Sequence, residues 1–319
     1  MSLAERPMLM TVNGSPKLLR SGLIRGSFIP PKDIRELRDL TRYKRKLVQT
    51  ISAEKNRIQR VLEDANIKLS SVVSDVFGVS GTEIIEALLN GETDVEELSK
   101  LAKGKLKNKG EELKEALLGK ITENHKLLIG LSLEHIKSLE CFIAKLDKTI
   151  KQKLERYKLE YELFKIIPGV KEEVAASIIA EIGVDMDRFP SPSHLSSWAG
   201  MSPGNNESAG KKKPSRTTHG NKWLKDILTE ASWAASRTKD TYPQGKYLKL
   251  VGRRGKKRAL IAVGHKILIM AYHIIKNKVP YKELGIDYLD RIRKPKVVRY
   301  YIRRLERLGY ELILYPKAA

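Results

Sequence analysis

One serine in the sequence stands where its hydroxyl could attack a phosphodiester. Ser208 lies in residues 200–216, whose glycines, prolines and asparagines predict a loop. Small residues and three lysines follow it, so the hydroxyl would be accessible and the lysines would offset the charge of a phosphate. The hydroxyl needs a base or a metal to take its proton, and Glu207 and His219 are the nearest side chains that could do so. Judged from the residues alone, a serine in such a place is more often a turn or capping residue.

Cations that could hold a nucleic-acid backbone form two clusters around and after this serine. The first continues from the loop into the start of the next helix, and the second precedes an apolar helix, where cations and a helix N-terminus coincide. The candidate DNA-binding residues of these clusters are Lys211, Lys212, Lys213, Arg216, Lys222, Arg253, Arg254, Lys256 and Lys257.

A Pro-Gly pair between two apolar helical stretches gives a third candidate contact. Pro168 and Gly169 predict a tight turn that leaves the free N–H groups of the second helix pointing outward, where a phosphate could bind. The pattern resembles the helix-hairpin-helix motif, which would place Pro168, Gly169 and Lys171 against DNA. A plain helix–helix turn produces a similar string, so both interpretations stay open.

The overall charge favours a polyanionic partner. The chain has 61 Lys and Arg against 38 Asp and Glu, for a formal net charge of +23, and such an excess attracts phosphate backbones. A ribosome-associated or other basic protein is the alternative. The single cysteine, Cys141, excludes an intramolecular disulfide, and we expect it to be buried.

Neither a metal site nor a membrane span is predicted. Glu181, Asp185 and Asp187 flank a helix end at Gly183 and lack a partner cluster. The apolar stretch 260–275 is interrupted by polar and charged residues, so we expect a cytoplasmic protein without a membrane span. The interrupting residues are His265, Lys266 and His273, and we interpret the two histidines as core or groove residues.

The elements that would position these residues are mainly α-helical. We expect an irregular leader over residues 1–31, a helical coiled-coil connector over 32–162 and an α-helical C-terminal domain over 163–319. The connector contains a long amphipathic helix from Asp33 to about residue 65, shorter helices over 68–125 and a second long helix over 136–161. Helices are also predicted over 221–237, 256–277 and 295–308, with no sheet beyond a short hairpin.

Two features of the connector bear on partners. The first long helix has a strongly basic face, and the second carries apolar residues at spacings of three and four over several turns. The second helix could form a homo-oligomeric coiled coil, or it could pair with the first in an antiparallel intramolecular hairpin. The cations of the basic face are Arg38, Arg42, Lys44, Arg45 and Lys46.

Four segments, in order, resemble the transposases of the insertion-sequence-110 class, which are similar to Piv-type DNA invertases. They are residues 27–31 (Ser-Phe-Ile-Pro-Pro), 35–42, 203–211 and 253–257, and the resemblance extends from Ser27 over nearly the whole chain. It implies a RuvC-like domain with four acidic ligands for Mg²⁺, a coiled-coil connector and a C-terminal domain with a nucleophilic serine, which Ser208 matches. It also implies a covalent serine–DNA link, DNA as partner, an oligomer and, in some members, a guide RNA.

The start of the chain departs from that pattern. Residues 12–26 contain no acid and Glu5 is the only one before Asp33, so we expect most of the RuvC-like half to be missing. We therefore expect a truncated transposase with no cofactor on this chain, and Mg²⁺ only for the full-length family enzyme. The main alternative is a non-catalytic DNA-binding remnant or regulator that assembles with full-length transposase. A helix-hairpin-helix nuclease would need a carboxylate cluster that the sequence does not show.

Overall fold

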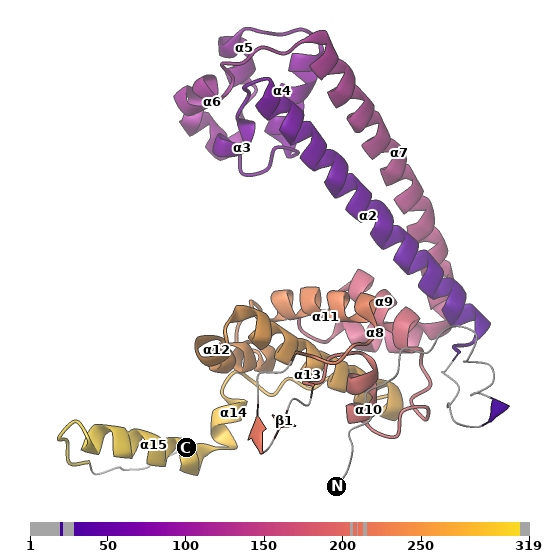
Figure 1. Ribbon diagram of the computed structural model, residues 1–319, viewed down its shortest axis with the longest axis vertical. Coiled ribbons are helices and arrows are strands. Elements are labelled where there is room, and N and C mark those ends of the chain that lie inside the picture. The colour runs from indigo at the N-terminus through magenta and orange to yellow at the C-terminus, as the bar shows by residue number, and fades with distance from the viewer. Residues whose placement is uncertain (1–19, 22–28, 205–206, 209, 213–215, 313–319) are drawn as a thin grey trace.

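The protein is mainly α-helical, with a long helical hairpin rising from a helical body (Figure 1). The computed structural model describes residues 20–21, 29–204, 207–208, 210–212 and 216–312. Most of the predicted leader therefore lies outside the described residues. Among the described residues the strands form one short two-stranded pair, which confirms the mainly α-helical fold class.

The hairpin consists of α2 (Lys32–Asp64) and α7 (Glu123–Leu154), which run antiparallel and pack along each other. Each of the two helices has buried apolar residues at helical spacing, among them Ile58 of α2 and Ile136 of α7. Thr122 caps α7, since its hydroxyl accepts a hydrogen bond from the His125 amide at 3.3 Å. The apolar pattern of the second long helix is thus used within the chain, as one of the two predicted alternatives requires.

A small helical cap closes the far end of the hairpin. Its core contains Ile84, Leu98 and Leu113 together with Leu62 and Ile129 of the two long helices. The shorter helices predicted over 68–125 are therefore confirmed. They are α3 (Leu69–Val72), α4 (Val79–Leu89), α5 (Val95–Lys100), the 3₁₀ helix η1 (Gly104–Lys109) and α6 (Gly110–Ala116).

The body is built around α13, which contacts α8, α10, α11 and α12. The central helix is long and apolar enough to cross a membrane, but 56% of its apolar window is buried inside the body, as in the core helix of a globular protein. The elements of the body are η2 (Glu155–Tyr157), α8 (Lys158–Lys165), α9 (Glu172–Ile182), α10 (Pro192–Trp198), β1 (Glu207–Ser208), β2 (Lys211–Lys212), α11 (Lys222–Ala235), α12 (Tyr242–Arg254), α13 (Lys256–Asn277), α14 (Tyr288–Arg291) and α15 (Lys294–Glu306).

The body's core extends into the base of the hairpin. Ile34 and Leu37 at the start of α2, and Ile150 and Leu154 at the end of α7, belong to the same buried cluster as Ile178 of α9. This core crosses the boundary that we placed between residues 162 and 163. Both ends of the hairpin are consequently fixed in the body.

Two local expectations need correction or addition. Cys141 is exposed on α7, so the expectation of a buried cysteine is wrong. Residues 242–254 form a helix that the sequence did not predict, because Pro243, Gly245 and Gly252 weaken the helical signal. The proline is tolerated because it lies in the first turn, and the Thr241 hydroxyl accepts the Gln244 amide at 3.4 Å.

Candidate nucleic-acid interface and the loop of Ser208

The loop that carries Ser208 is closed at its base by backbone contacts. The Gly204 amide donates to the Arg216 carbonyl at 2.8 Å, and the Thr218 amide donates to the Ser202 carbonyl at 3.1 Å. Below these bonds Gly200 and Gly220 pack so closely that a Cβ on Gly220 would lie 2.2 Å from the Gly200 nitrogen. The base therefore tolerates only glycine at this crossing, and the loop leaves the body as a narrow pair of chain segments.

Ser208 lies in a short antiparallel pair at the far end of this loop. It is opposite Lys211, and Gly210 makes the turn with a φ of +72°, which favours glycine. The pair lies on the side of the body away from the hairpin (Figure 1). The side chains of Ser208 and Lys212, and all of Lys213, lie outside the described residues, whereas Lys211 and Arg216 are exposed.

The helix that follows the loop is held by α9 and α2. The Asn221 side chain caps α11 by accepting the Leu224 amide at 3.2 Å, and its Nδ2 donates to the Glu181 carboxylate at 2.5 Å. The Lys225 ammonium donates to the Thr217 hydroxyl, which connects α11 to the loop base. Lys222 is exposed in the first turn. The loop is thus attached to the N-terminus of a helix that is capped by Asn221 and bonded to the loop base.

The buried Glu181 joins three helices and neutralises the basic face of α2. Its carboxylate, 2% exposed, accepts two hydrogen bonds from the Arg42 guanidinium, at 2.7 and 2.8 Å. The Arg38 guanidinium donates to the carbonyls of Ala180 and Glu181, at 3.0 and 2.8 Å, and so satisfies the end of α9. Arg45 pairs with Glu230 of α11. The strongly basic face predicted for α2 is therefore mostly turned against the body.

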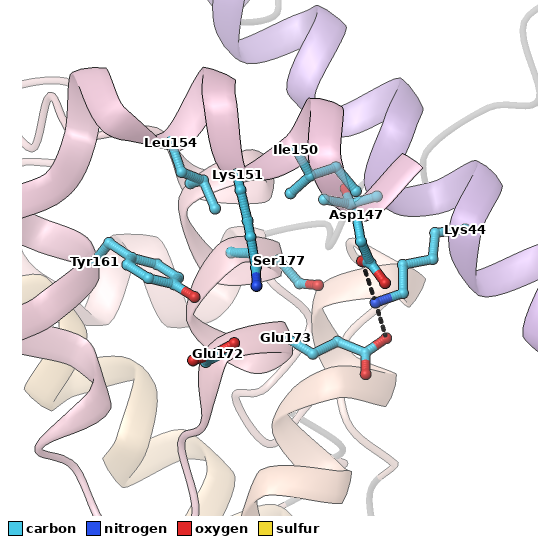
Figure 2. Close-up of a pocket in the computed structure, with 11 residues that line it drawn as sticks. Lys44, Asp147, Ile150, Lys151, Leu154, Tyr161, Glu172, Glu173 and Ser177 are labelled. Atoms are coloured by element: carbon cyan, nitrogen blue, oxygen red, sulfur yellow. Dashed lines mark ion pairs between the residues drawn. The ribbon is translucent and has the colours of Figure 1, made fainter. Parts of the chain in front are cut away.

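A pocket of about 270 Å³ lies beside this contact, where α2 and α7 meet α8 and α9 (Figure 2). The Lys44 ammonium lies 2.7 Å from the Asp147 carboxylate and 3.7 Å from that of Glu173. Burial raises the pKa of the Tyr161 phenol, and the charge of Glu172 raises it further. Because charges of both signs pair within the pocket, it serves as a joint between hairpin and body.

The second cation cluster lies where α12 ends and α13 begins. Gly255, with a φ of +77°, links the two helices, and no side chain caps the first turn of α13. Arg253, Arg254, Lys256 and Lys257 are exposed, and within the described part of the chain none of them forms an ion pair. Four unpaired cations next to uncapped amides provide an anion-binding surface.

The Pro168–Gly169 turn is a close contact between helices. Gly169 has a φ of +81°, and a Cβ there would lie 2.3 Å from the Ala231 carbonyl of α11. Lys171 is exposed at the start of α9, but Glu172 and Glu173 occupy the first turn, and their charges disfavour a phosphate. The DNA contact at Pro168, Gly169 and Lys171 stays a prediction.

Two of the three acids around the helix end at Gly183, Glu181 and Asp185, are paired within the chain. The Asp185 carboxylate accepts a hydrogen bond from the Arg188 guanidinium at 2.6 Å, which lowers its pKa. Glu181 is taken up by Arg42 and Asn221, as described above. Within the described residues no three His, Cys, Asp or Glu side chains come together as metal ligands. These residues therefore do not fit a Mg²⁺ site.

Sequence reasoning missed the buried Glu181 contact and a set of cations at the other end of α12. Lys246 and Lys266 lie close together between α12 and α13, with Arg293 nearby. Burial lowers the pKa of Lys246, and the charges of Lys266, Arg293 and Lys249 lower it further. Lys266 and Arg293 are 20 and 47 positions from Lys246 in the sequence, so no local pattern could have revealed them.

One region of the chain matches a known protein family. Residues 161–248 match the family model described as Transposase IS116/IS110/IS902 family. The matched region runs from α8 into α12 and contains Glu181 and the whole loop of Ser208. No curated protein matches the chain.

Proposed function

We propose that this chain is an insertion-sequence transposase that binds DNA and uses the Ser208 hydroxyl in strand cleavage and transfer. The proposal starts from the match of residues 161–248 to the model of the IS116/IS110/IS902 transposase family. The observation that carries the proposal is the position of Ser208 within the matched region. It lies on a two-stranded turn opposite the exposed Lys211, and the exposed Arg216 follows at the closed base of the loop. Such cations would offset the charge of a phosphodiester next to the serine.

The proposed step is a transesterification. The Ser208 oxygen attacks phosphorus, its proton passes to a base, and the bond from phosphorus to one deoxyribose oxygen breaks. One DNA strand is then joined to the serine, and the other ends in a hydroxyl that has taken up a proton. A deoxyribose hydroxyl that attacks this serine–phosphate ester completes strand transfer and restores the serine.

The base is not assigned, and no step runs through a metal. Glu207 precedes the serine and is exposed, which makes it the candidate to test by Glu207→Gln. Mg²⁺ is expected from the family resemblance, but Glu181 pairs with Arg42 and Asn221, and Asp185 pairs with Arg188. The alternative is a DNA-binding regulator without catalysis, which would use the same exposed cations.

DNA binding is proposed for the exposed cations around the loop and at the tip of α12 and α13. Arg253, Arg254, Lys256 and Lys257 have no ion pair within the described residues, in contrast to the arginines of α2. Unpaired cations can exchange solvent for phosphates without breaking internal contacts. Lys211, Lys212, Lys213, Arg216 and Lys222 complete this proposed surface.

Further partners are also proposals. Leu127, Leu131 and Phe142 of α7 are exposed. Exposed apolar side chains of this kind support a homo-oligomer through the hairpin. A guide RNA would compete for the same cations as DNA. A cytoplasmic location follows from a DNA substrate in the cell that carries the element.

The decisive experiment looks for a covalent protein–DNA adduct. The purified chain is incubated with labelled element-end DNA and Mg²⁺ and then separated under denaturing conditions. An adduct that disappears in Ser208→Ala and persists in Ser202→Ala, a serine of the same loop, supports the nucleophile. DNA binding without an adduct would instead establish the regulator, and an adduct that persists in Ser208→Ala would contradict the assignment.

A further inference from the structure

The last described helix, α15, is basic and stands apart from the body's core (Figure 1). It contains five Lys or Arg and a single acid, Glu306, and Arg307 follows its last turn. None of the side chains described in this helix is buried. A helix that buries no side chain gains no stability from the core. Packing therefore does not account for the cations of α15.

The cations of α15 are arranged along one face. Lys296, Arg299, Arg303 and Arg307 follow each other at spacings of three, four and four residues, which aligns them on the helix. A groove of about 730 Å³ follows this face. No ion pair involves these four side chains within the described part of the chain. The face therefore offers a row of unpaired charges to a linear polyanion.

Aromatic rings lie among these charges. Tyr300 and Tyr301 are each 57% exposed, and their ring centroids lie 5.3 Å apart at an interplanar angle of 74°. The Arg304 guanidinium donates to the Tyr300 hydroxyl at 3.4 Å. Cations alone suffice for the phosphates of a duplex, whose bases are already stacked. Exposed rings next to cations are suited to unpaired bases, which can stack on them.

We propose that α15 binds single-stranded DNA through phosphate contacts along its basic face and base stacking on Tyr300 and Tyr301. The inference rests on the proposed function for the choice of DNA among single-stranded nucleic acids. Strand cleavage and transfer expose unpaired DNA, whose phosphates and bases match the two kinds of side chain on α15. The function proposed for Ser208 does not depend on this surface.

The test measures binding of the full chain by fluorescence anisotropy. The probes are fluorescein-labelled oligothymidylate of about 20 nucleotides, longer than one binding site, a DNA duplex of equal length and oligouridylate. Tyr300→Ala with Tyr301→Ala should weaken oligothymidylate binding at least about tenfold and duplex binding less than about twofold. Tyr43→Ala, which removes a tyrosine 52% exposed on α2, is the matched control and should change neither.

The cations give an independent readout. Arg299→Ala with Arg303→Ala should reduce the slope of log affinity against log salt by about 1.4 for oligothymidylate, because each phosphate contact on a single strand contributes about 0.7. Lys137→Ala with Lys148→Ala, two exposed lysines of α7, should leave that slope unchanged. All of these variants should unfold at the temperature of the wild type.

Several results would overturn the inference. They are unchanged oligothymidylate binding in the tyrosine variant, an equal loss for the duplex, or oligouridylate binding tenfold tighter than oligothymidylate. Tighter binding of the full chain to anionic vesicles than to oligothymidylate would indicate a membrane surface and would overturn it as well. If the wild type binds duplex through Arg253 and Arg254 but does not bind oligothymidylate, the inference about α15 fails and the proposed function stands. If it binds no DNA at all, the proposed function fails with it.

Discussion

Replacing Glu181 with alanine would leave two arginines at the joint between hairpin and body without their shared counter-ion. The carboxylate is 2% exposed, and the Arg38 and Arg42 side chains are 17% and 32% exposed, so water cannot fully replace it. Removing one partner of a buried pair costs about 3–5 kcal/mol, because the remaining charge stays buried and uncompensated. The variant would also free the Asn221 amide that positions α11. We expect a loss at the upper part of that range.

Chemical and thermal unfolding measure this loss. For a unit the size of the body, 1 kcal/mol corresponds to about 2–4 °C, so a loss of about 4–5 kcal/mol should lower the midpoint by roughly 8–20 °C. Glu181→Gln keeps the side-chain volume and one hydrogen-bond acceptor, so its midpoint should lie between those of the wild type and Glu181→Ala. In a double-mutant cycle with Arg42→Ala, the two changes should be coupled by at least about 1 kcal/mol.

The matched control is Glu140→Ala, which removes an exposed glutamate from α7 and should shift stability by no more than about 0.5 kcal/mol. A loss below about 1 kcal/mol in Glu181→Ala, or additive effects in the cycle with Arg42, would refute the reasoning. The arginines of α2 would then be solvated instead of paired with the body, and they would return as candidates for DNA contact.

Three further predictions concern the core, the pH dependence and the DNA surface. Gly169→Ala should cost about 2–5 kcal/mol in unfolding free energy, since its φ is +81° and a Cβ would meet the Ala231 carbonyl at 2.3 Å. Burial and the hydrogen bond to Asp33 raise the pKa of Tyr157 to about 12. The wild type should therefore lose stability relative to Tyr157→Phe as the pH rises from 10 toward 12. Arg253→Ala with Arg254→Ala should reduce the salt slope of duplex binding by about 1.8, measured by titration at several salt concentrations.

Each of these has a control or a contradicting result. Gly252→Ala, in a helix with open space around its Cα, should instead stabilise the protein by about 0.5–1 kcal/mol. The phenol of Tyr157 donates to the Asp33 carboxylate, and this bond lowers the pKa of Asp33. The bond's contribution is present above the ordinary carboxylate pKa and is lost as the pH falls through the lowered one. An unchanged acid limb in Tyr157→Phe would contradict it. An unchanged salt slope in the arginine variant would exclude the α12–α13 tip from the DNA surface.

Local sequence signals predicted the elements better than their partners. The helix predicted over 256–277 has those bounds in the structure, because its apolar residues recur at helical spacing and Gly255 precedes it. The second long helix begins at Glu123, well before the predicted start at residue 136. Its early apolar residues, such as Leu127 and Leu131, face solvent and do not extend the buried stripe.

The partners of charged residues could not be predicted, because they lie far apart in the sequence. Arg42 and Glu181 are 139 positions apart, and only the hairpin's return to the body brings them together. A basic helix face looks the same in sequence whether it meets DNA or buried acids. For the loop of Ser208, glycine and proline predicted a turn, but the crossing of Gly200 and Gly220 depends on sterics that composition does not carry.

Both ends of the hairpin are fixed in one core, so the length of its helices sets how far the cap lies from the body. At a rise of about 1.5 Å per residue, α2 holds the cap about 50 Å from its own start. Removing seven residues from each long helix would retract the cap by about 10 Å and keep its facing, because seven residues make nearly two full turns. The length of the two helices thus sets the distance between a ligand at the cap and a ligand at the loop of Ser208.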